Sequence, residues 1–277
     1  MPASAQERLA AYLAHIGMDA PATADAHALE AVQRAHRMAI GFENLDVMLG
    51  RGIALEPDAV FAKLVMGARG GYCFEHNHLL GEMLSALGFA NRALLARVWL
   101  GVEEGVVPPR THTLRLVAVG GEPWIADAGF GGAYVPALPL VDGARATTSD
   151  GARHRLRLIG APGEVRGQWL VERAAGPDWA PQYSFDLAQV DPADIALVNH
   201  WTSTRSGTRF TTACIAAMVL EDGFASLHGR RLSMQAGGRS DVMEITRAQD
   251  WRTVLGDLFR VELSVEEVAA LGLFPAP

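Results

Sequence analysis

Hydrophobic residues in the first ninety positions recur every three or four residues, which predicts helices. This spacing falls in residues 5–17, 26–38, 57–65 and 73–87. Gly17 and Gly88 stand where the first and last of these helices should end, as glycine often does. In the last helix Cys73, Asn77 and Leu80 share one face, which we expect to pack inward.

After about residue 93 the hydrophobic period changes to two, which predicts strands. The predicted strands are residues 93–100, 111–119, 123–128, 153–159, 168–172, 211–220 and 223–228. Helices should follow at residues 247–259 and after Ser264, each opened by a capping box, from Thr246 to Gln249 and from Ser264 to Glu267. The order of elements predicts an α+β protein with helices first, a β lobe over roughly residues 90–200, and a mixed segment last.

Composition and charge narrow the function. A chain of 277 residues can bury a large core, and 49% hydrophobic with 20% charged residues is typical of soluble proteins. The net charge is −7 and the basic residues are scattered apart from residues 153–157, so we expect no nucleic-acid partner. We also expect no membrane span and no signal peptide, because no run of 18 apolar residues and no basic start with an apolar run occurs.

The two cysteines, Cys73 and Cys214, are too few for a disulfide framework, so a reducing cytoplasm is expected. Cys214 lies in an apolar strand and is interpreted as a core residue. Cys73 stands at a predicted helix start behind Gly70 and Gly71. A helix N-terminus stabilises a thiolate, and glycines leave room above the sulfur. The alternative is a buried structural cysteine.

His112 and Asp127 are the predicted partners of Cys73. If residues 120 and 121 form a two-residue hairpin turn, Asp127 lies opposite Leu114 and diagonal to His112, about 7–8 Å away at the backbone. Cysteine, histidine and aspartate then suggest a nucleophile, its base and the group that orients the base. The alternative is a buried His–Asp pair without chemistry.

A metal site is not expected. Cys73, Glu75, His76 and His78 point in different directions on a helix, and no second Cys/His pair has zinc spacing. The metalloprotease, Walker A and serine-elbow motifs are also missing from the sequence. Five further histidines have no visible partner and are interpreted as surface or cap residues: His15, His27, His36, His154 and His228.

The combined motifs strongly resemble the arylamine N-acetyltransferases. Residues 69–77 match Arg-Gly-Gly-x-Cys-x-Glu-x-Asn, and further matches are residues 42–46, Thr111-His112, Asp127-x-Gly129-Phe130-Gly131 and, more weakly, residues 179–185. The chain departs from the family pattern at Gly41, often proline, and at residues 204–210, where the family usually carries a His-Pro element.

The resemblance implies a helical bundle (residues 1–89) that carries the nucleophile, a β-barrel (90–200) that carries His112 and Asp127, and an α/β lid (201–277). It implies acetyl transfer from acetyl-coenzyme A to a small aromatic amine or hydrazine through an acetyl-cysteine. Thr111, Gly129, Phe130 and Gly131 are the expected coenzyme contacts, and Phe130 and Phe210 the expected walls of the acceptor site.

Three alternatives share the triad. An amide synthase would use a carrier-bound acyl chain and a roomier channel. A cysteine protease or transglutaminase would need a peptide. A binding module would keep the triad without using it. For Arg69 we expect a structural role, with Glu43 and Asp46 as acidic partners, because a buried arginine needs counter-charges.

Overall fold

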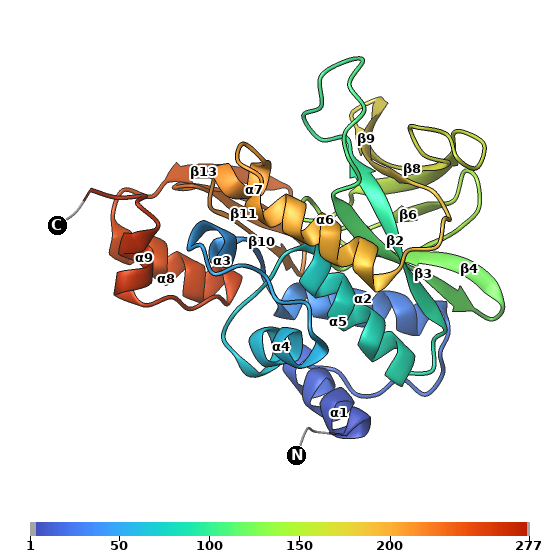
Figure 1. Ribbon diagram of the computed structural model, residues 1–277, viewed down its shortest axis with the longest axis horizontal. Helices are drawn as coiled ribbons and strands as arrows, with labels where there is room; N and C mark the ends of the chain where they lie inside the picture. The colour runs from blue at the N-terminus through green and yellow to red at the C-terminus, as the bar shows by residue number, and fades with distance from the viewer. Residues whose placement is uncertain (1–3, 276–277) are drawn as a thin grey trace.

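The computed structural model describes residues 4–275 and confirms the predicted α+β class. Figure 1 shows three parts: a group of helices with the N-terminus at the bottom, a large sheet at the upper right, and a smaller sheet with two helices on the left. The division at residues 89 and 200 stays a prediction.

The N-terminal helices pack around one apolar core. They are α1 (Ala5–Ile16), α2 (Ala26–Ala39), α4 (Pro57–Phe61) with its π-helical continuation η1 (Ala62–Met66), and α5 (Cys73–Ala86), with a short α3 (Leu45–Met48). The predicted boundaries are therefore correct to within a residue or two. Their shared core is fully buried and includes Tyr12, Leu29, Val32, Leu64, Leu80 and Leu84.

The larger sheet has eight antiparallel strands and curls into a nearly closed barrel (Figure 1). Its spatial order is β5-β4-β3-β2-β9-β8-β7-β6. The strands are β2 (Asn91–Val98), β3 (His112–Val119), β4 (Glu122–Ala126), β5 (Leu138–Pro139), β6 (Arg145–Thr147), β7 (Arg153–Leu158), β8 (Trp169–Ala175) and β9 (Asp178–Phe185). Inward side chains such as Leu94, Leu114, Leu156 and Val171 fill the interior.

The predicted hairpin between β3 and β4 is confirmed in its register. Gly120 and Gly121 both have positive φ, and Val119 pairs with Glu122. The ladder runs to the pair of Arg115 with Ala126, so Asp127 follows directly at the end of β4. The turn thereby fixes how close Asp127 comes to the start of β3.

The smaller sheet joins the segment that follows α2 to the C-terminal part of the chain. Its order is β1 (Phe42–Glu43), β10 (Ile215–Leu220), β11 (Gly223–His228), β12 (Arg231–Ala236) and β13 (Arg239–Glu244), all antiparallel. Helices α8 (Ala248–Phe259) and α9 (Val265–Ala270) cover it, with Trp251, Leu255 and Phe259 buried. The pairing of β1 with β10 brings the C-terminal part against the loop that precedes Cys73.

Two segments differ from the sequence prediction. Residues 192–204 form helix α6 (Pro192–Thr204), and residues 209–212 form the short helix α7 (Arg209–Thr212), where a β lobe and a strand from residue 211 were expected. Asp191 caps α6 by accepting from the Ala193 N–H, and Pro192 fits the first turn. In Figure 1, α6 crosses the middle of the molecule between the two sheets.

Three smaller expectations were wrong. Thr246 does not cap α8, because the helix begins one residue later and its cap, Arg247, makes no side-chain hydrogen bond. His36 and His154 are fully buried rather than on the surface. His36 is held by Tyr12 and His76, whereas His154 points inward from β7. The capping box predicted at Ser264 is present.

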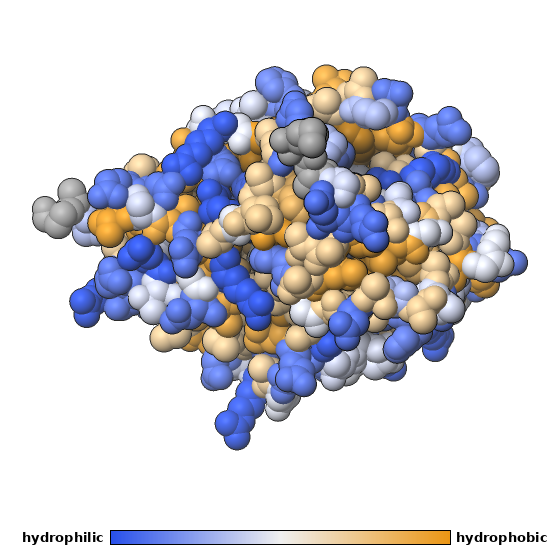
Figure 2. Space-filling view, turned by 90° about the horizontal axis from the view of Figure 1, so that it is seen from below, coloured by the Kyte–Doolittle hydropathy of each residue, from blue (hydrophilic) through white to orange (hydrophobic). Residues whose placement is uncertain are grey.

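Apolar and charged residues are mixed on the face of the molecule that Figure 2 shows. Figure 2 shows the face below the helical bundle, where apolar residues lie among charged ones. Across residues 4–275, every helix is too short or too polar to cross a bilayer.

Candidate active site

Cys73 is the first residue of α5 and is almost fully buried. The loop before it is fixed by two backbone hydrogen bonds, from the Gly71 N–H to the Gly41 carbonyl (3.2 Å) and from the Glu43 N–H to the Gly71 carbonyl (2.7 Å). A side chain at Gly70 would collide with the Gly41 carbonyl. Gly70 is therefore needed for close packing of this loop against Gly41, the last residue before β1.

A cluster of charged side chains also holds this loop in place. Arg69 contacts Glu43 at 2.7 Å and Asp46 at 2.9 Å, which confirms the predicted pairing. Lys63 lies 2.7 Å from both Asp46 and Glu75. Burial raises the pKa of Glu75 to about 7, although the Lys63 ammonium opposes that rise. Glu75 also accepts the Tyr72 N–H at 3.0 Å, so the cluster reaches the residue next to the nucleophile.

His112 begins β3 and is bonded to Asp127 (Nε2 to Oδ2, 2.7 Å). Because the carboxylate accepts from Nε2–H, the other nitrogen, Nδ1, is left to take up a proton. Asp127 Oδ1 accepts two further bonds, from Asn77 (2.9 Å) and the Gly129 N–H (2.8 Å). Burial alone would favour the protonated acid, but His112 and these donors hold the pKa of Asp127 below its usual value.

The ring of His112 is also held by packing. Phe130 lies edge-on to it at 5.6 Å and Tyr183 is tilted against it at 5.1 Å, measured between ring centres. Gln33 accepts the Asp127 N–H at 2.6 Å and thereby ties α2 to the end of β4. The contributions of Gln33 and Tyr183 carry no local sequence signal, because each depends on elements far away in the chain. Asn77 belongs to the matched motif, but its bond to Asp127 was not anticipated.

The Cys73 thiol lies 3.8 Å from the Thr111 carbonyl oxygen, the acceptor of its hydrogen bond. Burial raises the pKa of this thiol, and the negative charge of Asp127 raises it further. The N–H groups of Thr113 and Phe74 act in the opposite direction. While His112 is neutral, the thiol therefore keeps its proton. A thiolate is stabilised here only when its proton has passed to the imidazole, which then stands as the counter-ion.

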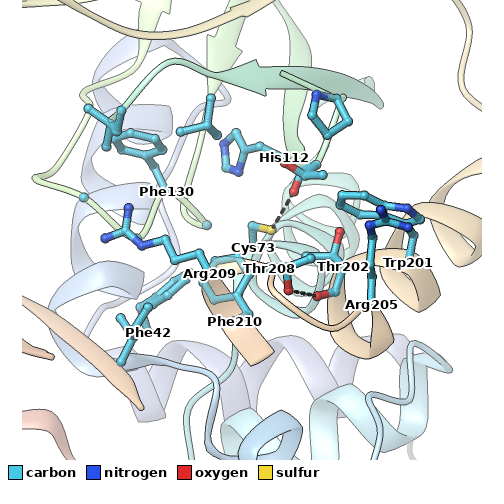
Figure 3. Close-up of a pocket in the computed structure, with 18 of the residues that line it drawn as sticks. Phe42, Cys73, His112, Phe130, Trp201, Thr202, Arg205, Thr208, Arg209 and Phe210 are labelled. Carbon is cyan, nitrogen blue, oxygen red and sulfur yellow. Dashed lines mark hydrogen bonds between the residues drawn. The ribbon is translucent and has the colours of Figure 1, made fainter. Parts of the chain in front are cut away.

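A cavity of about 430 Å³ opens onto the sulfur (Figure 3). The predicted site residues that line it are Cys73, Thr111, His112, Gly129, Phe130, Gly131 and Phe210. The structure thus brings all of them to one pocket except Asp127, which lies behind His112. Gly129 approaches the nucleophile so closely that an added Cβ would stand 2.6 Å from the Cys73 carbonyl oxygen.

The wall opposite His112 comes from α6 and α7, where the sequence analysis predicted only Phe210 and missed the other residues. It contributes Trp201, Thr202, Arg205, Thr208 and Arg209. Cys214 is buried and outside this pocket, as expected for a core residue. Within residues 4–275, three His, Cys, Asp or Glu side chains nowhere gather closely enough to hold a metal ion.

Comparison with known proteins places this fold and pocket in a family. A family model described as N-acetyltransferase matches residues 25–268. An arylamine N-acetyltransferase of Mycolicibacterium smegmatis is 32% identical over 92% of this chain and 92% of its own length. That of Escherichia coli K12 is 37% identical over 76% of this chain and 73% of its own length.

Solved structures agree with the sequence matches. The arylamine N-acetyltransferase of Salmonella typhimurium superposes with a TM-score of 0.88 at 30% identity, covering 95% of this chain and 97% of that one. The Mycobacterium marinum enzyme in complex with CoA gives 0.82 at 31% identity, covering 95% and 94%. The chain belongs to the arylamine N-acetyltransferase family. It is an acyltransferase.

Proposed function

We propose that this enzyme transfers the acetyl group of acetyl-coenzyme A to an arylamine or arylhydrazine through an acetyl-cysteine on Cys73. The observation that carries the proposal is the His112–Asp127 hydrogen bond of 2.7 Å at the pocket that holds the Cys73 thiol. The names of the relatives and the CoA-bound structure of one of them support the choice of donor and acceptor.

In the first half-reaction the Cys73 proton passes to His112 Nδ1 and the thiolate attacks the thioester carbonyl. The oxyanion that forms is stabilised by backbone N–H groups in the first turn of α5, where a helix leaves its donors unpaired. Asp127 stabilises the imidazolium. The carbon–sulfur bond to the coenzyme then breaks, His112 returns the proton to the departing thiolate, and the acetyl group stays on Cys73.

In the second half-reaction the amine nitrogen attacks the acetyl-cysteine, and His112 accepts the proton that the nitrogen loses. Collapse of the tetrahedral intermediate breaks the bond to sulfur, and the proton restores the thiol. An arylamine is largely neutral at pH 7, so its lone pair is available. A simple alkylamine arrives mostly as the ammonium ion and must first lose a proton.

The pocket suits a small, flat acceptor and limits hydrolysis. Phe130 and Phe210 supply apolar faces on which a ring can stack. Thr111, Gly129 and Gly131 are assigned to the coenzyme, whose thioester must reach Cys73 past the glycine loop. A cavity of about 430 Å³ favours a small acceptor over the long acyl chain of an amide synthase.

We assign the nucleophile to residues 1–89, its two partners to residues 90–200, and the closing wall to residues 201–277. We also place the enzyme in the cytoplasm, because both cysteines are free and the nucleophile needs a reducing surrounding.

Initial-rate kinetics test this function. With acetyl-coenzyme A and aniline varied together, the double-reciprocal plots should give parallel lines, as expected when an acetyl-enzyme separates the two steps. Arylamines and arylhydrazines should be acetylated faster than simple alkylamines. Intersecting lines, or an alkylamine preferred over every arylamine tried, would contradict the proposal.

A further inference from the structure

The pocket around Cys73 has an unbalanced charge. Among the described residues that line it are two guanidinium groups, those of Arg205 and Arg209, and not one carboxylate. Arg205 ends α6, where it lies 5.5 Å from the ring centre of Trp201 in a cation–π contact. Arg209 begins α7, directly before the acceptor-wall residue Phe210.

Arg209 has no counter-ion within the part of the chain that the structure describes, residues 4–275. The nearby Arg110, in contrast, pairs with Asp186. Arg209 is exposed toward the pocket, yet neighbouring side chains remove enough water to lower its pKa. A guanidinium stays charged under such conditions, so the pocket keeps an unpaired positive charge.

The placement of Arg209 connects this charge to the aromatic side of the pocket. In Figure 3 its guanidinium extends toward Phe130, on the other side of Cys73 from Arg205 and Trp201. The rings of Phe42 and Phe210, whose centres are 5.9 Å apart, lie on the same side. A flat ring held by these phenylalanines would therefore present its substituent to Arg209 and its amine to the acetyl-cysteine.

A second polar residue, Thr202, lines the same wall of the pocket. Thr202 is only 2% exposed, lines the cavity, and its hydroxyl has no hydrogen-bond partner among the described residues. A buried hydroxyl without a partner costs stability. The α6–α7 wall thus presents one charged group without a counter-ion, the Arg209 guanidinium, to the pocket.

We propose that Arg209 is a specificity-determining residue that binds a carboxylate on the acceptor, so that the preferred acceptors are arylamines with an anionic ring substituent. This inference rests on the proposed acetyl transfer to arylamines. A guanidinium and a carboxylate form two parallel hydrogen bonds, which adds orientation to attraction. The anchored ring is then held with its amine directed at Cys73, and positioning of this kind raises the rate of the second half-reaction.

The test compares matched acceptors. 4-Aminobenzoate carries the carboxylate. 4-Aminobenzamide is neutral and nearly the same in shape, and methyl 4-aminobenzoate is neutral and larger by one methyl group. In the wild-type enzyme, kcat/KM should be about 10- to 100-fold higher for 4-aminobenzoate. In Arg209→Gln this preference should collapse to less than about threefold, through a fall in kcat/KM for 4-aminobenzoate. Arg209→Lys should retain part of it, because the charge stays and the fork is lost.

Two control variants test whether the preference depends on the position of Arg209 or only on the loss of a positive charge. Arg239→Gln removes the same charge from an exposed position on the edge strand β13 and should leave the preference intact. Arg205→Gln removes the other pocket cation and should also keep most of the preference. A wild-type enzyme without the preference, an unchanged preference in Arg209→Gln, or its loss in Arg205→Gln alone would each overturn the assignment.

The coenzyme phosphates are the other possible source of an anion, and the first half-reaction distinguishes them. Acetylation of the enzyme is measured with acetyl-coenzyme A and with 4-nitrophenyl acetate, which has no phosphate. If Arg209→Gln slows only the acetyl-coenzyme A reaction, Arg209 binds phosphate and the assignment fails. If the wild-type enzyme forms no acetyl-enzyme and acetylates none of the arylamines, the proposed function itself fails.

Discussion

Removal of the Arg69 side chain should destabilise the protein without directly weakening coenzyme binding. The Glu43 side chain is fully buried, and Arg69 is its cationic partner at 2.7 Å. Arg69→Ala leaves that carboxylate without its ion-paired cation, whereas Asp46 keeps Lys63 at 2.7 Å. Loss of one partner of a buried pair costs about 3–5 kcal/mol. Because the Arg69 side chain remains 17% exposed, we expect a loss of unfolding free energy at the lower end of this range, about 3 kcal/mol.

That loss translates into a fall in melting temperature of about 6–12 °C for a chain of this size. Thermal unfolding followed by circular dichroism measures it. Arg51→Ala is the matched control, because Arg51 also contacts Asp46, at 3.5 Å, but is 45% exposed, so it should change stability by less than about 1 kcal/mol.

A double variant tests the reason for the loss. Combining Arg69→Met with Glu43→Gln removes both charges, and the amide oxygen can still accept the Leu45 N–H that Glu43 now accepts at 2.6 Å. It should recover part of the stability lost in Arg69→Met alone. A variant Arg69→Ala with a normal melting temperature and a large rise in KM for acetyl-coenzyme A would refute the structural role and assign Arg69 to the coenzyme.

Three further changes probe the site. In His112→Gln the pKa of Cys73 should rise further, because burial and the charge of Asp127 then act on a thiolate without its counter-ion; iodoacetamide alkylation across pH measures this, and an unchanged profile would contradict the ion pair. Glu75 has a pKa of about 7 and binds its proton more tightly in the folded than in the unfolded chain. The wild type should therefore lose stability relative to Glu75→Gln as pH rises from about 5 to 8. A difference in melting temperature that stays constant over this pH range would argue against this. Gly129→Ala should lower kcat/KM at least about tenfold by displacing Cys73, whereas Gly256→Ala on α8, with open space around it, should not; equal activities would show that the close approach is unimportant.

The site could be located from the sequence because its parts are local. The glycine pair before Cys73 and the hairpin at residues 120–121 each determine their geometry within a few residues. The hairpin register alone was enough to bring His112 toward Asp127. The pairing of Arg69 with Glu43 also followed from simple charge rules.

Helix α6 could not be predicted from the sequence because its buried face is polar and its exposed face carries apolar residues. Its buried residues, Asn199 and Thr202, are polar, while the apolar Leu197 is 69% exposed. A helix whose outer face is apolar shows no hydrophobic stripe, so periodicity gives no signal. As a result the predicted site contained only Phe210 from this wall and lacked Arg209. His36 was misplaced for a similar reason, since its partners come from two other helices.

The most direct measurement is the mass of the intact protein after incubation with acetyl-coenzyme A and no acceptor. The wild-type enzyme and Cys214→Ala should each gain the mass of one acetyl group, which peptide mapping should locate on Cys73, and addition of an arylamine should remove it. Cys73→Ser should gain nothing and lose almost all transfer activity, because a serine hydroxyl is far less acidic than a thiol. An acetyl group on another residue, or substantial transfer by Cys73→Ser, would contradict the role of Cys73 as the acetyl carrier.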